Sequence, residues 1–139
     1  MLSYAIKGSP KEIEKQLFQL HANREYYDPT NLGFKAGILI ENCIEFHKSN
    51  PIVWEIFHRL AVQVSKKKTH FGVAAIWERM RWELAIEIDN DLEYKLNNDY
   101  KAFYSRLFNE VAQKDFFTMR ESIFDEVHYE VLAKELPCS

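Results

Sequence analysis

Cysteine, glycine, proline and long apolar runs are all scarce in this 139-residue chain. The only cysteines are Cys43 and Cys138. Because Cys138 is the penultimate residue, we expect reduced thiols in a cytosolic setting rather than a structural disulfide. The 4 Gly and 4 Pro are too few for a loop-rich or all-β protein. No apolar run approaches the roughly 20 residues of a membrane-spanning helix, and residues 1–7 lack the apolar core of a signal peptide.

An excess of positive charge and the short motifs of known enzyme classes are also missing. The formal charge is −3, so no overall basic field favours nucleic acid or an anionic membrane. The chain has no glycine-rich phosphate loop, no His-Glu-x-x-His and no Gly-x-Ser-x-Gly pattern. We therefore expect no enzyme, no catalytic residue and no cofactor.

Hydrophobic residues make up 47% of the chain and aromatic residues 14%, enough for one buried core. Ser9-Pro10 and Asn50-Pro51 are typical helix starts. Apolar spacing and breakers predict helices at 9–23, 34–48, 51–66, 73–88, 99–112 and 115–136, the last bent near 120. They also predict a turn at 26–33, a loop at 89–98 with a short extended piece at 93–96, and Asn98 as an N-cap.

The predicted fold is all-α: a compact bundle of about six helices with short connections in a single domain, 1–139. Within that domain we expect an N-terminal helical pair at 1–50, a core at 51–120 and a C-terminal helix at 121–139.

The predicted helix 73–88 has two apolar sides. Five residues cluster on the first side: Val73, Ile76, Trp77, Met80 and Leu84. Ala75, Trp82 and Ile86 follow one line on the opposite side, with Arg79 in the same row. One interpretation buries the second side at the centre of the fold, with Trp82 packed under the N-terminal helices. The other exposes Trp82 and Arg79 to a partner, since Trp and Arg dominate binding hot spots.

The predicted helix 99–112 carries a polar row of Lys101, Ser105 and Asn109, with Arg106 beside it. Such side chains can contact base edges and phosphates. An ordinary solvated surface is the more common explanation of such a row.

Three residue pairs resemble parts of metal sites, and none predicts one. Glu55 with His58 and Asp125 with His128 have the carboxylate-x-x-His spacing of di-iron bundles, but these pairs lie away from the apolar stripes of their helices. Cys43 and His47 share a helical face without a second pair of matching spacing. A buried cysteine beside a hydrogen-bonded histidine is the simpler interpretation.

Two segments of the middle of the chain carry a family resemblance. They are Trp77-Glu78-x-x-Arg81-Trp82-Glu83 and Lys95-Leu96-Asn97-Asn98-x-Tyr100-x-x-x-Tyr104-x-Arg106. With Trp54, His70-Phe71-Gly72 and Phe116-Phe117, they resemble a family of small proteins encoded by bacteriophages and prophages. The resemblance covers 51–120 and implies expression from a mobile element in a bacterial cytoplasm. It implies no particular reaction.

Two functions are compatible with these patterns. In the first, the protein binds a host or phage protein, such as a regulatory or defence factor, through Arg79, Trp82 and Ile86, while acidic residues of the following loop steer a basic partner: Asp89, Asp91 and Glu93.

In the second, the helices 52–66, 73–88 and 99–112 form a helix-turn-helix unit on DNA. Lys101, Ser105, Arg106 and Asn109 would then contact bases, and Lys66, Lys67 and Lys68 would contact phosphates. Basic and acidic residues balance nine to nine between 51 and 112, which favours the first function. A homodimer that forms through Trp82 is a further use of the face proposed for protein binding.

Overall fold

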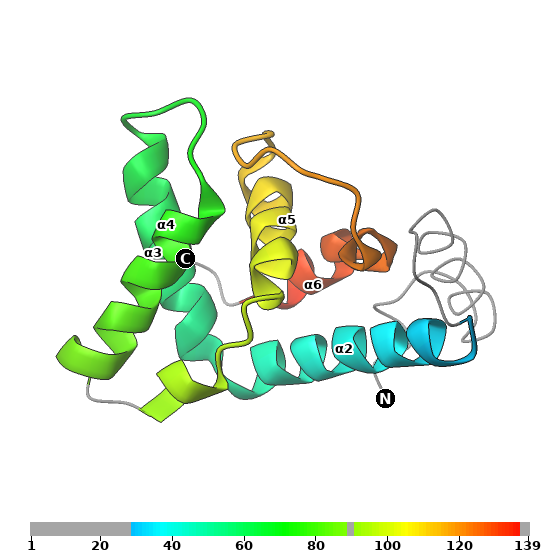
Figure 1. Cartoon of the computed structure of the whole chain (residues 1–139). Coiled ribbons are helices and arrows are strands. Elements are labelled where there is room, and N and C mark those ends of the chain that lie inside the picture. Colours follow the sequence, from blue (N-terminus) through cyan, green and yellow to red (C-terminus); the bar gives the residue numbers. More distant parts are fainter. Residues whose placement is uncertain (1–28, 89–90, 137–139) are drawn as a thin grey trace. The chain divides into compact units, whose positions relative to one another are not determined.

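The computed structural model describes residues 29–88 and 91–136 of the chain. These residues are all-α: helices joined by short connections, with no β-strand element among them (Figure 1). The chain divides into two compact units, a core unit of residues 49–119 and a terminal unit of 1–48 with 120–139. The single domain expected from the sequence remains a prediction, and the helix predicted at 9–23 lies outside the described residues.

The terminal unit contains α2 (Pro29–Ser49), whose last residue falls in the core unit, the 3₁₀ turn η4 (Ile123–Glu126) and α6 (Tyr129–Glu135). The apolar spacing of the predicted helix 34–48 puts Ala36, Leu39, Ile40, Cys43 and His47 on one stripe. All of these are buried except Leu39, which is half-buried, so the stripe is confirmed. The predicted turn is wrong from residue 29 onward, because α2 begins at Pro29. Proline suits the first position of a helix, where no backbone N–H is needed for a hydrogen bond.

The single helix predicted at 115–136 is wrong. Gln113 adopts a left-handed conformation with φ 55° and ends α5. The chain becomes helical again only after Ser122, whose hydroxyl accepts a hydrogen bond from the Phe124 N–H while the Asp125 carboxylate accepts one from the Ser122 N–H. This reciprocal cap starts η4 as a new turn.

The core unit contains α3 (Pro51–Ser65), α4 (Val73–Trp82), the π-helical turn η2 (Glu83–Glu87), the 3₁₀ turn η3 (Asp91–Lys95) and α5 (Tyr100–Ala112). The predicted helices 51–66 and 99–112 are confirmed within one residue at each end. The extended piece predicted at 93–96 is wrong, because η3 occupies most of it. Leu92 within η3 and Leu96 directly after it are both buried, a spacing of four that a helical turn and a strand share, so the sequence pattern alone could not separate the two.

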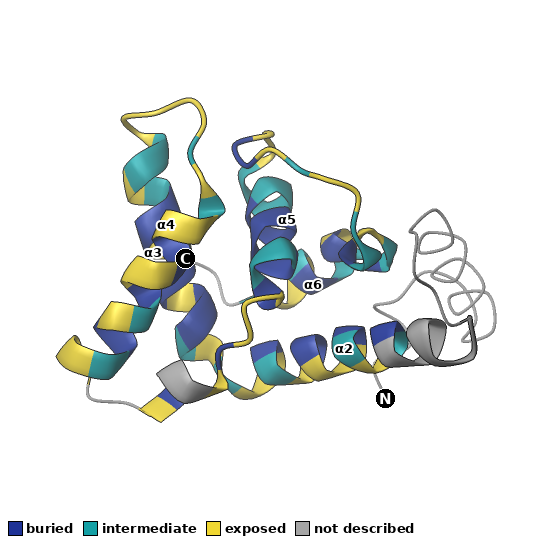
Figure 2. Cartoon of the chain, viewed as in Figure 1, coloured by how far each residue is buried: buried dark blue, intermediate teal, exposed yellow. Residues whose placement is uncertain are grey.

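Aromatic rings fill the core of this unit. The ring centroid of Tyr104 lies 5.6 Å from those of Phe57 and Trp77, and Phe57 lies 5.8 Å from Phe117. Rings at such separations add to the stabilisation from burial alone. Every residue of α5 is buried or half-buried, whereas α4 has one buried and one exposed side (Figure 2). α5 therefore has no fully exposed residue, whereas α4 is buried on one side only.

Candidate functional site

The helix formed by α4 and η2 presents its second apolar side to solvent. Four of the five residues predicted on its first side are buried, and the fifth, Val73, is half-buried: the buried four are Ile76, Trp77, Met80 and Leu84. The Ile88 N–H donates to the Glu83 carbonyl oxygen at 2.9 Å, five residues back, which is the hydrogen bond of a π turn. This wider turn keeps the chain helical through Glu87. The helix therefore has buried and exposed residues up to the end of η2.

Three of the four exposed large hydrophobic residues in the described part of the chain belong to this segment. Trp82 is 45% exposed, Ile86 63% and Ile88 41%, while Ile38 of α2 is the fourth. The expectation that Trp82 lies in the core is wrong, because the buried side of the helix is already filled by Trp77 and its neighbours. Arg79, Trp82 and Ile86 are exposed, as the second interpretation of this helix expects, and Ile88 is a further exposed apolar residue directly after η2.

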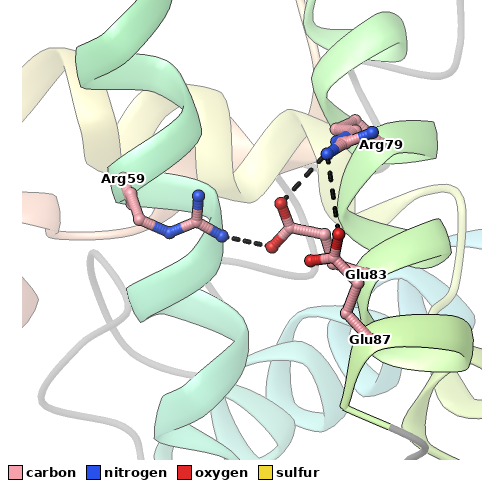
Figure 3. Close-up of polar contacts among 4 residues, drawn as sticks. All are labelled: Arg59, Arg79, Glu83 and Glu87. Carbon is pink, nitrogen blue, oxygen red and sulfur yellow. Dashed lines mark hydrogen bonds and ion pairs between the residues drawn. The ribbon is translucent and has the colours of Figure 1, made fainter.

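Arg79 is stacked on this surface. Its guanidinium carbon lies 4.7 Å from the centroid of the Trp82 ring. The same side chain has its Nε 3.6 Å from Glu83 Oε1 and its NH2 nitrogen 3.9 Å from Glu87 Oε1 (Figure 3). Stacking and ion pairing together restrict the conformations of a long side chain that is still 54% exposed.

Glu83 ties the exposed row to the rest of the core unit. It is a buried acid, and its second carboxylate oxygen accepts a hydrogen bond from Arg59 of α3 (Figure 3). A buried carboxylate requires such partners, because an unpaired charge out of water is costly. The sequence offers the Arg79–Glu83 pair as an i, i+4 spacing, but it gives no signal for Arg59, which comes from another helix.

The two segments that carry the family resemblance meet in the core unit. Arg81 donates from its guanidinium to the Asn98 side-chain oxygen at 2.7 Å and lies 3.5 Å from the Glu78 carboxylate. Asn98 is therefore not the N-cap of α5 that the sequence predicts. Asn97 takes part of that role, since its side-chain oxygen accepts a hydrogen bond from the Asp99 N–H at 2.9 Å.

The acidic loop is described only in part. Asp91 is exposed. Asp89 lies outside the described residues, and the side chain of Glu93 is not described either. Steering by these three acids remains a prediction.

The polar row proposed to contact DNA is mostly buried or engaged within the core unit. Ser105 and Arg106 are buried, and each donates a hydrogen bond to the Ala102 carbonyl oxygen. The Asn109 side chain donates to the Phe117 carbonyl oxygen and accepts from the Phe117 N–H, both at 3.0 Å, and so clamps the chain after α5. Lys101 is half-exposed, so this row is not the solvated face that the sequence suggests. Lys66, Lys67 and Lys68 are exposed beyond the end of α3.

The residues weighed as metal ligands have other contacts. His58 is stacked on Trp54 with centroids 5.1 Å apart, and burial lowers its pKa, while Glu55 is exposed. Asp125 serves in the cap before η4, and His128 lies 2.9 Å from Glu130. No group of three metal-ligating side chains gathers anywhere within residues 29–88 and 91–136.

Cys43 and His47 lie together on the buried side of α2. Burial raises the pKa of the Cys43 thiol, which holds the sulfur in its unreactive protonated form. Burial also lowers the pKa of His47 to about 4, and the nearby Glu135 carboxylate offsets part of that shift. Both groups are therefore neutral near pH 7.

Comparison of the chain with models of protein families, with curated proteins and with solved structures gives no match. Among the described helices, none combines the length and the apolar character that a membrane crossing requires. The candidate site therefore rests on the geometry of the core unit.

Proposed function

We propose that this chain is a small non-enzymatic binding protein whose partner is another protein, contacted through Arg79, Trp82 and Ile86. The observation that carries the proposal is the exposure of Trp82 and Ile86 on a helix whose opposite side is packed in an aromatic core. Large apolar side chains gathered at one place on a surface mark interaction sites. Trp and Arg are the residues most enriched among binding hot spots.

The resemblance of the middle of the chain to bacteriophage and prophage proteins supports a setting for this function. A protein from a mobile element that acts in a bacterial cytoplasm meets host factors, including regulators and defence proteins. Exposed Asp91, with Asp89 and Glu93, supplies negative charge next to the apolar row in sequence. Such charge would speed the approach of a basic partner.

DNA binding is the second candidate, and the exposed lysines 66–68 are the observation in its favour. Lysines contact phosphates without reading sequence. The burial of Ser105 and Arg106 and the clamp made by Asn109 leave few side chains on α5 for base contacts. We therefore rank this function below protein binding.

Capture from a bacterial lysate tests the proposal when bait variants are compared. The wild-type protein and an Ile38→Ser control, altered at an exposed apolar residue of the terminal unit, should capture the same host protein. Trp82→Ala and Ile86→Ser should lose it while keeping the wild-type circular dichroism spectrum. Equal capture by all four baits would overturn the proposal.

Fluorescence anisotropy with mixed-sequence duplex DNA at low and moderate salt separates the two candidates. Phosphate contacts make binding weaken steeply as salt is added. We expect no binding at low salt. Salt-sensitive binding that disappears when Lys66, Lys67 and Lys68 are replaced by Gln would promote the DNA function instead.

A further inference from the structure

The exposed row on α4 and η2 has the spacing of a helix-pairing seam. Ala75, Arg79, Trp82 and Ile86 follow one another at intervals of four, three and four residues, and all four are exposed. In an α-helix this alternation keeps one stripe facing a second helix; Ala75, Arg79 and Trp82 lie in α4, and Ile86 follows in the π turn η2. The element that fits this face is therefore another α-helix.

The row is complementary to itself when two copies run antiparallel. A two-fold axis at the midpoint of the row sets Ala75 opposite Ile86 of the second copy and Arg79 opposite its Trp82. Each layer then joins a small side chain to a large one, or a guanidinium to an indole ring. The Arg79–Trp82 contact already forms within one chain, at 4.7 Å, so the same chemistry recurs across the pair.

A parallel pair lacks this complementarity. It would set Arg79 against Arg79 and Ala75 against Ala75, which opposes like charges in one layer and leaves a gap in another. Two antiparallel helices also place their dipoles in opposite directions, which is the favourable arrangement.

The charges around the row permit two copies to approach. Arg59 and Arg79 offset Glu83 and Glu87, so the cluster of ion pairs carries no net formal charge (Figure 3). In the antiparallel register, Glu87 of the second copy lies opposite Ala74. Along the helix axis, Arg79 is then five residues from the Glu87 of the second copy, about 7.5 Å at the rise of an α-helix, whereas its own Glu87 is eight residues away. The second copy therefore places a carboxylate at a shorter axial distance from Arg79.

We infer that the partner seated on this face is a second copy of the chain, joined as an antiparallel pair of α4–η2 helices about a two-fold axis. This inference rests on the proposed function for the use of the exposed face, and it assigns that face to a second copy of this chain in place of a host or phage protein. The row from Ala75 to Ile86 spans only about 16 Å of helix, so the buried area falls at or below the roughly 800 Å² per partner of a standard interface. The dimer should therefore dissociate on dilution through the micromolar range.

Disulfide trapping between variants that each carry one added surface cysteine tests the register. Full-length Ala75→Cys and Ile86→Cys proteins are made with Cys138→Ser as the background, while Cys43 stays in place because it is buried and protonated. Under mild oxidation, an equal mixture of the two variants should give a cross-linked dimer, whereas each variant alone should give almost none. In the antiparallel register the two copies of position 75 stand about 16 Å apart, and disulfide formation needs Cα atoms within about 7 Å.

Sedimentation equilibrium completes the test. Mixture-specific cross-linking, together with a concentration-dependent dimer that Trp82→Ala abolishes, supports the inference. Cross-linking of each variant alone as fast as the mixture overturns the antiparallel register. A monomer at every concentration with no cross-link overturns self-pairing. In that last case, loss of lysate capture on Trp82→Ala would leave the proposed function standing, and unchanged capture would remove it as well.

Discussion

Trp77 and Trp82 lie five residues apart on one continuous helix and differ in what they contact. Trp77 is 0% exposed and packs against Phe57 and Tyr104, while Trp82 is 45% exposed and holds the Arg79 guanidinium. The two residues are of the same type, and both fit an apolar helical spacing. Only their packing in the folded chain distinguishes Trp77, which stabilises the core, from Trp82, which forms part of the surface. The comparison predicts that stability and binding can be separated on opposite sides of this helix.

The largest effect is expected at Trp77. Trp77→Ala should lower the free energy of unfolding by about 3–5 kcal/mol, because it empties a large site inside a packed aromatic core. Chemical denaturation followed by circular dichroism measures this change. Trp77→Phe is the matched control. The Trp77 Nε1–H has no hydrogen-bond partner within the described part of the chain, so Phe removes an unpaired donor along with some volume and should cost much less. Equal losses for Ala and Phe would contradict this account.

The next largest effect is expected in the terminal unit, where stability should depend on pH through His47. The pKa of His47 is about 4 in the folded protein, below the ordinary 6.5 of an unfolded chain. Its contribution to stability is complete above pH 6.5 and falls as pH drops toward 4, because the unfolded chain takes up the proton first. Between pH 7 and pH 5 the loss should be about 2 kcal/mol.

Denaturation at these two pH values, for wild type and His47→Gln, measures the effect. The variant should lose most of the pH dependence, although the lowered pKa of His58 contributes a smaller effect in the same direction. His70→Gln, altered at an exposed histidine, should keep the wild-type dependence.

A smaller effect is expected at Glu83, which joins the two sides of the helix. Glu83→Gln should destabilise the core unit by about 1–2 kcal/mol, less than a fully buried ion pair would, since the arginines that lose their partner can turn to water. Glu87→Gln is the control, because an exposed carboxylate of this kind contributes at most about 0.5 kcal/mol. Thermal unfolding of the two variants side by side measures the difference. A larger loss for Glu87→Gln would contradict the structural role given to Glu83.

The sequence predicted the helices of the core unit and their buried stripes well, since period and breakers are local properties. It could not decide between the two sides of α4, because Trp77 and Trp82 both satisfy an apolar periodicity. It also assigned Asn109 and Ser105 to a surface, whereas their partners come from the chain after α5. Asn109 holds the backbone of Phe117, and Ser105 lies 3.7 Å from the sulfur of Met119. These contacts form because the segment after α5 folds back against that helix. The spacing of residues within one helix cannot predict them.

The smallest change in stability is expected at Trp82, together with the largest change in binding. Trp82→Ala removes a half-exposed ring and its contact with Arg79, so it should cost less than about 1 kcal/mol of unfolding free energy. Association with the partner should nevertheless fall at least tenfold, as expected for a hot-spot tryptophan. Sedimentation equilibrium and chemical denaturation on the same preparation measure both quantities. Ile38→Ala, altered at the exposed apolar residue of α2, should leave both the unfolding free energy and the association close to those of the wild type. If Trp82→Ala unfolds the protein as readily as Trp77→Ala does, then Trp82 belongs to the core, and the division of this helix into a folding side and a binding side is wrong.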